Sequence, residues 1–239
     1  MKFSPPLIPG VLLAREKRFL AHVRLAGGEI VVAHTNNTGS MTGVSEPGSR
    51  VWVSPAEGPR RKLAWTWEIV ETLSPRVLVG INTLRANALA QEGIESGLIA
   101  PLAGYDRLKR EARSGPGTRF DFLLGRGDAG TPRDLAWVEV KSVTLLEEGR
   151  ALFPDAVTQR GRRHLLALTE RKAAGERAVL LFIVQRADAR SVGPADAIDP
   201  AYGRALRQAA ANGVEILGYK AAVSPKGIDL TAPLPVVLA

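Results

Sequence analysis

Two carboxylates and a lysine in apolar surroundings are the residues of this sequence best suited to chemistry. Asp121 lies in the apolar stretch 119–124, and Glu139 follows 18 positions later, two positions before Lys141. Close carboxylates repel one another unless a cation lies between them, and Mg²⁺ or Mn²⁺ prefers carboxylate oxygens. A lysine beside them can orient a water, help to deprotonate it and stabilise charge on a phosphate. These catalytic residues therefore predict metal-dependent phosphodiester hydrolysis, with Asp121 and Glu139 as metal ligands.

Two neighbouring strands have to hold these side chains. Residues 118–124 and 135–145 read as strands joined by a Gly-rich loop, so Asp121 can lie beside Glu139. Glu139 and Lys141 are two positions apart, so on a strand both side chains leave the same face. The surrounding elements are predicted as a helix beginning at Asn82 or Thr83, a strand over 106–113, helices over 158–174 and 202–212, and strands over 178–184 and 214–220. Their order, α-β-β-β-α-β-α-β, predicts a sheet covered by helices.

The first 80 residues follow a different pattern. They contain about five short alternating stretches and no convincing helix: 10–15, 19–25, 30–34, 50–54 and 62–71. Short strands in this number are typical of a small closed barrel, because closure removes exposed strand edges. An OB-fold is the common barrel that also binds polyanions. The fold class is therefore mixed α/β, with an OB-like barrel over residues 1–80 and a second domain over 81–239.

The second domain resembles the PD-(D/E)XK nuclease superfamily, which carries an Asp and a Glu-X-Lys on the second and third strands of an αβββαβ core. Longer stretches are similar to the sugar fermentation stimulation protein A family, and the resemblance runs from the N-terminus to about residue 228. The segments that carry it are 33–43, 46–48, 79–83, 119–124, 138–145 and 153–165, with the block at 153–161 the most specific.

This resemblance implies an OB-like barrel, a PD-(D/E)XK-like domain and DNA binding. Asp121, Glu139 and Lys141 fall on the three core positions of the superfamily. Such nucleases often carry an extra acid on the first helix, which would be Glu92, and some carry a Gln on the helix after the third strand, which would be Gln159. For Glu92, an exposed helix acid is the commoner reading.

Glu111, on the first candidate strand, could point into the same cleft as Asp121 and add a metal ligand. Basic and polar groups elsewhere are expected to contact DNA phosphates, through side chains, backbone N–H groups or the start of a helix. These predicted nucleic-acid-binding residues are Arg60, Arg61 and Lys62, then Asn36, Asn37 and Thr38, and finally Arg160, Arg163 and His164. Trp52, Trp65 and Trp67 could stack on bases, but packing in the barrel core is the commoner role.

Composition and charge set the outer limits. The 239 residues carry a net charge of +8, and residues 1–80, with ten basic and six acidic side chains, account for half of it. A basic surface attracts polyanions, chiefly nucleic acid. The lack of cysteine excludes disulfides, thiolate metal sites and a cysteine nucleophile. No signal peptide and no apolar run long enough to span a membrane is visible, which favours a cytoplasmic protein.

Two functions are compatible with these patterns. One is a metal-dependent nuclease that binds DNA with little sequence preference, and the intact set of three residues favours it. The alternative is a non-catalytic DNA-binding or regulatory protein that affects sugar-metabolism genes. A phosphodiesterase acting on RNA or nucleotides is a third, weaker reading. A homodimer stays open, although no self-association segment is visible.

Overall fold

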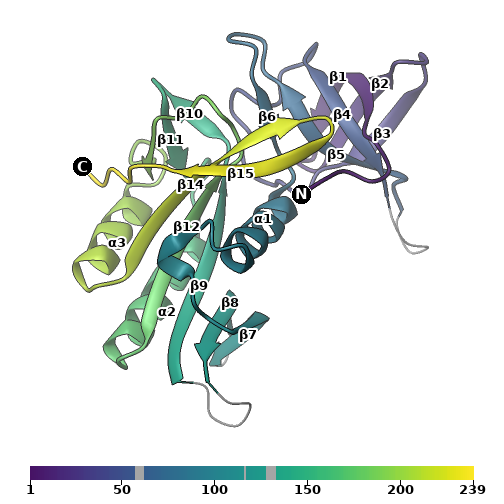
Figure 1. Cartoon of the computed structure of the whole chain (residues 1–239). Coiled ribbons are helices and arrows are strands. Elements are labelled where there is room, and N and C mark those ends of the chain that lie inside the picture. The colour runs from purple at the N-terminus through teal and green to yellow at the C-terminus, as the bar shows by residue number, and fades with distance from the viewer. Residues whose placement is uncertain (57–61, 116, 128–132) are drawn as a thin grey trace.

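Five strands close the N-terminal part of the chain into a barrel (Figure 1). The computed structural model describes residues 1–56, 62–115, 117–127 and 133–239. Barrel strands follow the order β3-β2-β1-β4-β5, and β3 pairs again with β5, so the predicted barrel is confirmed. Its strands are β1 (Ile8–Glu16), β2 (Leu20–Leu25), β3 (Ile30–His34), β4 (Arg50–Pro55) and β5 (Trp65–Glu71), with β6 (Leu78–Gly80) added beside β5.

Alternating apolar residues fill the inside of the barrel. Trp67 is fully buried there, and its indole N–H donates to the carbonyl of Ile69 at 2.9 Å. Trp52 is 5% exposed and Trp65 is partly buried against the same core. The expectation that the tryptophans pack in the barrel core is therefore confirmed for Trp67, whereas Trp52 is buried in a separate cluster with Leu7 and Ile69.

A six-stranded sheet forms the centre of the C-terminal part, in the order β15-β14-β12-β9-β8-β7. β12 runs parallel to both β9 and β14, whereas β7, β8 and β15 join their neighbours antiparallel. The strands are β7 (Arg107–Gly115), β8 (Thr118–Arg126), β9 (Arg133–Val143), β12 (Arg177–Val184), β14 (Glu215–Ser224) and β15 (Gly227–Pro233).

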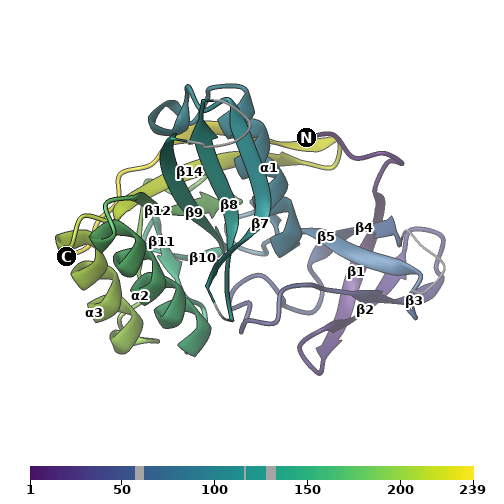
Figure 2. The same cartoon turned by 90° about the horizontal axis from the view of Figure 1, so that it is seen from below.

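Helices cover both faces of this sheet (Figure 2). Helix α1 (Thr83–Glu95) packs on one face, and α2 (Gln159–Ala173) and α3 (Pro200–Ala211) pack on the other. On β12, Leu180 points to α2 and α3 while Leu181 points to α1. The continuous apolar run of β12 thus has the physical cause expected from the sequence, which is burial on both sides.

Side chains at the helix starts fix where α1 and α2 begin. The Asn82 side chain accepts from the Leu84 N–H at 3.1 Å, and the Thr158 hydroxyl accepts from the Gly161 N–H at 3.0 Å. Both satisfy N–H groups that have no partner inside the helix. These caps place the starts of both helices next to the strand ends that carry the candidate site.

Several short elements were not predicted. They are β15, the 3₁₀ helix η1 (Ala100–Leu102) and a small sheet of β10 (Leu145–Glu147), β11 (Arg150–Phe153) and β13 (Ser191–Pro194). Most have only three or four residues, which is too few to establish a period. β15 is an edge strand with half of its side chains exposed, so no apolar run marks it.

The two parts of the chain contact each other at more than their connection. The Phe3 N–H donates to the Lys226 carbonyl at 3.0 Å, and the Ile228 N–H donates to the Met1 carbonyl at 2.9 Å. The N-terminal residues therefore lie along the β14–β15 hairpin, as Figure 1 shows. Among the described residues, no helix has the length and apolar character needed to cross a membrane.

Candidate active site

The carboxylates lie where β8 and β9 separate. The antiparallel pairing of these strands runs up to Phe122 opposite Val138 and ends there, one position before Asp121 and Glu139 would face each other. In place of a backbone carbonyl, the Asp121 carboxylate accepts the Val140 N–H at 2.7 Å. Both acids line one cavity of about 300 Å³. The sequence spacing therefore does bring them together.

Asp121 is held from two sides. Its Oδ2 takes the Val140 N–H, and its Oδ1 accepts a 2.7 Å hydrogen bond from the Asn87 side-chain amide on α1. Burial raises the pKa of Asp121 and the nearby charge of Glu139 adds to the rise, while the two hydrogen bonds oppose it. Asn87 was missed in the sequence, because nothing in a helical Asn indicates which strand residue it will reach.

Glu139 is almost completely buried, with 4% of its side chain exposed. Its Oε1 accepts from the Lys141 ammonium at 2.5 Å and also contacts the ring Nδ1 of His164. Burial by itself would raise the pKa of Glu139, but the charge of Lys141 and the contact with His164 outweigh it, so its pKa is lowered. Its Oε2 is buried and has no hydrogen-bond partner among the residues the structure describes.

Lys141 lies between Glu139 and α2. Its Nζ is 3.4 Å from the His164 Nδ1 and its side chain is 12% exposed. Glu139 and Lys141 therefore share one face of β9, as expected, and that face is the one covered by α2. The site consists of Asp121 on one side and a contiguous Glu139, Lys141 and His164 group on the other.

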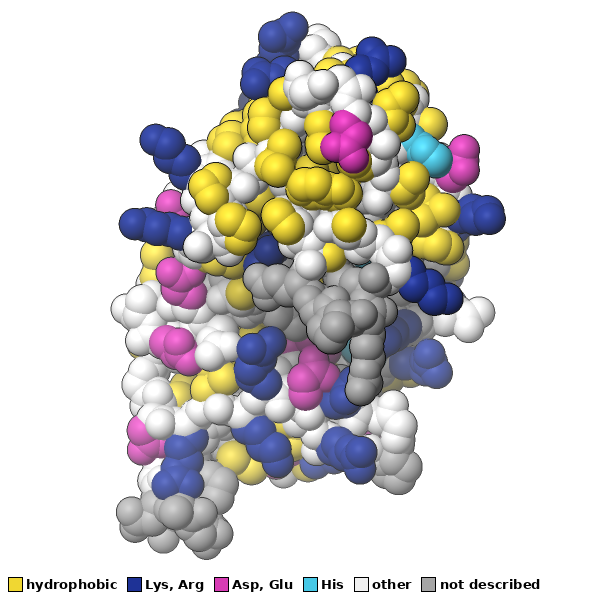
Figure 3. Space-filling view, turned by 90° about the vertical axis from the view of Figure 1, so that its right-hand side faces the viewer, with side chains coloured by type: hydrophobic (Ala, Val, Ile, Leu, Met, Phe, Trp, Pro, Cys, Tyr) yellow, Lys and Arg dark blue, Asp and Glu magenta, His cyan; other side chains and the backbone are white. Residues whose placement is uncertain are grey.

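A basic groove adjoins this cavity. A second cavity, of about 750 Å³, is lined by Arg113 and Arg119 on the β7–β8 hairpin and by Arg160 and Arg163 on α2. Arg160 lines both cavities, so one opens beside the other. Figure 3 shows Lys and Arg side chains gathered on the half of this face below the barrel. Polyanions that enter the groove would be led toward the carboxylates.

His164, a predicted DNA contact, lines the basic groove, and its ring also reaches the carboxylate site. The residue is 8% exposed and its ring contacts Glu139 and Lys141. α2 begins at Gln159, so a residue five positions later faces the sheet, whereas Arg160 and Arg163 stay exposed. Gln159 itself is exposed and is not among the residues that line the carboxylate cavity.

The two additional acids lie away from the cavity. The side chain of Glu92 is 60% exposed and pairs with the N-terminal ammonium at 2.9 Å, since it lies on a different side of α1 from Asn87. Glu111 has a positive φ of 53°, which breaks the alternation of β7, and its exposed carboxylate pairs with Arg119 at 2.7 Å. The structure therefore does not support either as a ligand beside Asp121.

The polar loop of the barrel meets the second domain at the cavity. Asn37 lines it and is mostly buried, whereas Asn36 donates to the Asn82 side chain at 3.0 Å and Thr38 is exposed. Asp155, another lining residue, accepts from the Met41 N–H at 3.1 Å. The barrel thus completes one wall of the carboxylate cavity.

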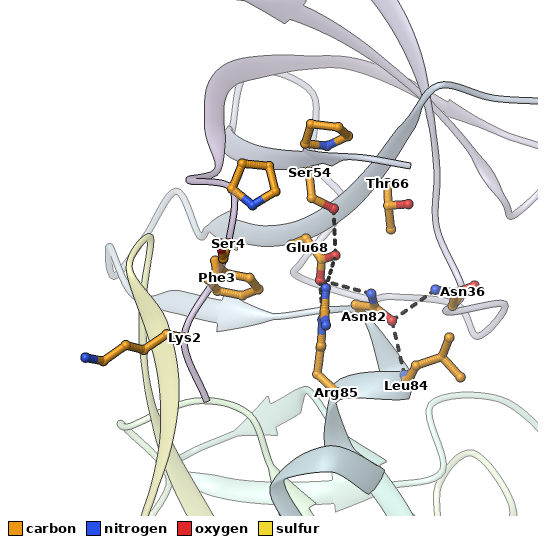
Figure 4. Close-up of a pocket in the computed structure, with 12 residues that line it drawn as sticks. Lys2, Phe3, Ser4, Asn36, Ser54, Thr66, Glu68, Asn82, Leu84 and Arg85 are labelled. Carbon is orange, nitrogen blue, oxygen red and sulfur yellow. Dashed lines mark hydrogen bonds and ion pairs between the residues drawn. The ribbon is translucent and has the colours of Figure 1, made fainter. Parts of the chain in front are cut away.

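A buried polar network holds the same interface from the other side. The Glu68 carboxylate, 1% exposed, accepts from Ser54, Asn82 and Arg85 at 2.7–3.0 Å (Figure 4). These contacts line a pocket of about 340 Å³ between the barrel and the start of α1. Because α1 also carries Asn87, the network fixes the helix that holds Asp121.

The oxygen donors around Asp121 and Glu139 limit the kind of metal ion that the site could hold. In the described part of the chain, no group of three or more Asp, Glu or His side chains is arranged to hold an ion. Two carboxylates are nevertheless enough for Mg²⁺, which keeps several waters and takes further oxygens from a phosphate. The buried, unpaired Oε2 of Glu139 fits such an ion, because a carboxylate oxygen without a donor otherwise carries an uncompensated cost.

Lys62 is exposed, at the end of the barrel, and does not line either cavity. The predicted DNA contacts Arg60 and Arg61 lie outside the described residues.

Comparison with known proteins decides the family. The model of the SfsA N-terminal OB domain matches residues 13–81, and that of the sugar fermentation stimulation protein RE domain matches residues 84–227. The chain belongs to the SfsA family. SfsA membership confirms the resemblance drawn from the motifs at 33–43, 119–124 and 153–161.

SfsA relatives match along the whole chain. A sugar fermentation stimulation protein homolog of Geotalea daltonii is 53% identical over 100% of both chains, and one of Geobacter sulfurreducens is 52% identical over 97% of each. The solved structure of Pyrococcus furiosus SfsA in complex with Ca²⁺ has a TM-score of 0.87, with 30% identity over 99% of this chain and 98% of that one.

Proposed function

We propose that the protein binds DNA and hydrolyses its phosphodiester bonds at the Asp121–Glu139–Lys141 site with the help of Mg²⁺ or Mn²⁺. The observation that carries the proposal is the buried, unpaired Oε2 of Glu139 in a cavity that it shares with Asp121 and that adjoins an arginine-lined groove. The Ca²⁺ named for the Pyrococcus furiosus relative supports it, because Ca²⁺ and Mg²⁺ both take oxygen ligands.

Asp121 and Glu139 would hold the cation, and Asn87 and the Val140 N–H would keep the Asp121 carboxylate oriented. A divalent cation bound there supplies positive charge that stabilises the developing charge on the phosphate and makes a water more acidic. Lys141 would orient that water and hold the phosphate through its ammonium. Arg160, which lines both cavities, would bind a neighbouring phosphate.

His164 is the residue that the structure adds to this group. Its ring touches the same Glu139 oxygen as Lys141, so it helps to neutralise that carboxylate and to keep its second oxygen free. The contact with substrate is then left to Lys141, which lines the carboxylate cavity.

One observation favours the alternative, a DNA-binding protein without catalysis. Both Asp121 oxygens already accept hydrogen bonds, and Glu139 already pairs with Lys141 and His164. A site that neutralises itself in this way can hold its shape without a metal and serve only to place a phosphate.

The test is incubation of the purified chain with plasmid, linear duplex and single-stranded DNA in Mg²⁺, Mn²⁺ or EDTA. The proposal predicts cleavage that needs the metal and falls at least ~100-fold in Asp121→Ala and in Lys141→Ala, because each removes a group that acts on the reacting phosphate. Arg204→Ala, an exposed position on α3, is the matched control. No cleavage of any substrate, with DNA binding unchanged in both variants, would support the alternative.

A further inference from the structure

We propose that the barrel carries a base-stacking site for an unpaired DNA strand, formed by Phe19 at the entrance to β2 and by His34 at the end of β3. This inference rests on the proposed function, since it names single-stranded DNA as the form the protein recognises. The site is a small apolar pocket that none of the proposed catalytic residues lines.

An exposed aromatic ring is the first observation. Phe19 is 41% exposed, and its ring leans against the His34 ring at a centroid distance of 6.4 Å and an angle of 43°. Together with Leu20 and Leu63, the two rings line a pocket of about 370 Å³ whose surface is mostly apolar. Flat apolar surface open to solvent is the platform on which a nucleobase stacks.

Basic side chains lie at and near this apolar floor, next to one exposed acid, Glu16. Lys62 lines the pocket, and Lys17 and Arg18 are exposed in the turn just before Phe19. Within the described residues, no acidic side chain lines the pocket. An apolar platform with a basic rim suits a nucleotide, whose base is apolar on its faces and whose phosphate is anionic. An apolar protein segment would not need the ammonium of Lys62 at the pocket.

The pocket is linked to the catalytic cavity by a fixed stretch of backbone. His34 is three residues before Asn37, which lines that cavity, so the two lie within roughly 10 Å of chain. The Arg15 guanidinium donates to the carbonyls of Arg18, Asn37 and Gly39 at 2.7–3.1 Å. It therefore ties the turn beside Phe19 to the loop at the cavity.

The same loop is anchored to the second domain. The Asp155 carboxylate accepts from Met41, and a Cβ on Gly39 would lie 2.2 Å from it, so the loop sits directly against Asp155. The stacking site, the loop and the carboxylates thus form one stable surface. A strand whose base rests on Phe19 could place a phosphate only a few nucleotides away at Asp121 and Glu139.

An unpaired strand fits this arrangement better than a duplex. In a duplex the faces of the bases are covered by their stacked neighbours, so a protein ring reaches them only where the strand is unpaired. We therefore expect the protein to bind single-stranded DNA, or the unpaired end of a branched substrate, more tightly than a blunt duplex.

The experiment measures binding of a labelled 20-nucleotide single strand and of the matching duplex by fluorescence anisotropy, using the full chain in EDTA so that no cleavage occurs. Phe19→Ala and Phe19→Leu are compared with Ile30→Ala, which changes an even more exposed apolar residue at the far end of the same strand pair. Phe19→Ala and Phe19→Leu should each weaken single-strand binding roughly 5- to 50-fold, since stacking on one ring stabilises binding by that order, and leave duplex binding unchanged.

A base analogue gives a direct readout. A 2-aminopurine in the strand should lose fluorescence on binding to the wild type and to Phe19→Trp, and keep it with Phe19→Leu. Thermal unfolding of each variant shows whether the barrel still folds. Equal loss of single-strand and duplex affinity, or an equal effect of Ile30→Ala, would overturn the stacking site.

The outcome is separable from that of the proposed function. Selective loss of single-strand binding in Phe19→Leu supports the stacking site even if no metal produces cleavage. Metal-dependent cleavage with unchanged single-strand binding in Phe19→Leu would support the nuclease and overturn the stacking site.

Discussion

Asp121 and Glu139 are similar side chains whose surroundings shift their pKa values in opposite directions. Burial raises the pKa of Asp121, whereas Lys141 and His164 reverse the effect of burial on Glu139 and lower its pKa. Glu139 is therefore ionised over a wide pH range, while Asp121 carries its charge at a cost that a bound cation would remove.

Asp121→Asn should raise the melting temperature of the metal-free protein at pH 7. A carboxyl with a raised native pKa loses stability for the fold as the pH rises above its ordinary value of 3.8, because the unfolded chain then gains more by ionising. The gain should disappear toward that pH, where Asp121 is protonated in both states. Differential scanning calorimetry in EDTA at a series of pH values measures it.

Glu139→Gln provides the opposite sign in the same experiment. Its lowered native pKa stabilises the fold above the ordinary value of 4.5, and that contribution is lost as the pH falls. We expect a lower melting temperature at pH 7, with Lys141 and His164 left without their anion. A melting temperature that moves in the same direction for both variants would contradict the pKa assignments.

Asn87 should matter for metal affinity although it does not touch the ion. Asn87→Ala removes one of the two hydrogen bonds that orient Asp121, and loss of such a supporting contact costs about 10- to 100-fold in metal affinity. Titration of Mn²⁺ by calorimetry tests this. The control is Gln91→Ala one turn further along α1, where the side-chain amide bonds Glu95 instead. Equal affinities for all three proteins would disprove the role.

At the scale of elements, the start of α1 is the connection between the barrel and the catalytic sheet. Asn82 and Arg85 at this helix start donate hydrogen bonds to Glu68 on β5. Asn87, further along α1, donates to Asp121. β8 and β9 separate one position before the acids, which leaves room for a cavity where continuous pairing would have filled it. The position of Asn87 and the opening between β8 and β9 both depend on how the elements pack.

Glu68→Ala should destabilise the fold by about 2 kcal/mol, because it removes the acceptor that the buried Asn82 amide and the Arg85 guanidinium share. Arg85 is a third exposed, which softens the loss. Urea unfolding measures the change. Glu71 lies on the same strand as Glu68 and forms a longer, more exposed ion pair with Arg50 of β4. Glu71→Ala should therefore cost less than ~0.5 kcal/mol. Equal losses would show that the network contributes no more than a surface pair.

At the scale of the whole molecule, two parts that look independent in the sequence share one working surface. Some cations are paired with acids, as Arg162 is with Asp199 and Arg177 with Glu215. Figure 3 shows other Lys and Arg side chains on the part of that face below the barrel. The useful charge is therefore the part that the fold leaves unpaired beside the cavities.

Binding to DNA should weaken steeply with salt, because phosphate contacts release counterions. Arg160→Ala and Arg163→Ala should each reduce the slope of log affinity against log salt concentration by about one, with little change in sequence preference. Anisotropy titrations between low and physiological salt measure the slope. Arg204→Ala on α3 should leave it unchanged, and an equal change in that variant would place the DNA elsewhere.

The sequence by itself determined the barrel followed by a sheet covered by helices, the order of the main elements along the chain and the closeness of Asp121 to Glu139 and Lys141. Each of these follows from local rules: strand alternation sets the face of a side chain, and apolar runs mark the buried strands. Glu111 was misjudged because one residue with positive φ cancels the alternation on which the prediction depended.

Only the tertiary structure decided which helix residues join the site. His164 and Asn87 lie on helices, and the direction in which a helical side chain points is fixed by how the helix rotates and docks on the sheet. The same holds for Asn37 and Asp155, which come from different parts of the chain and meet because the barrel packs against the second domain. Such contacts depend on long-range packing energy, which no local pattern of residues encodes.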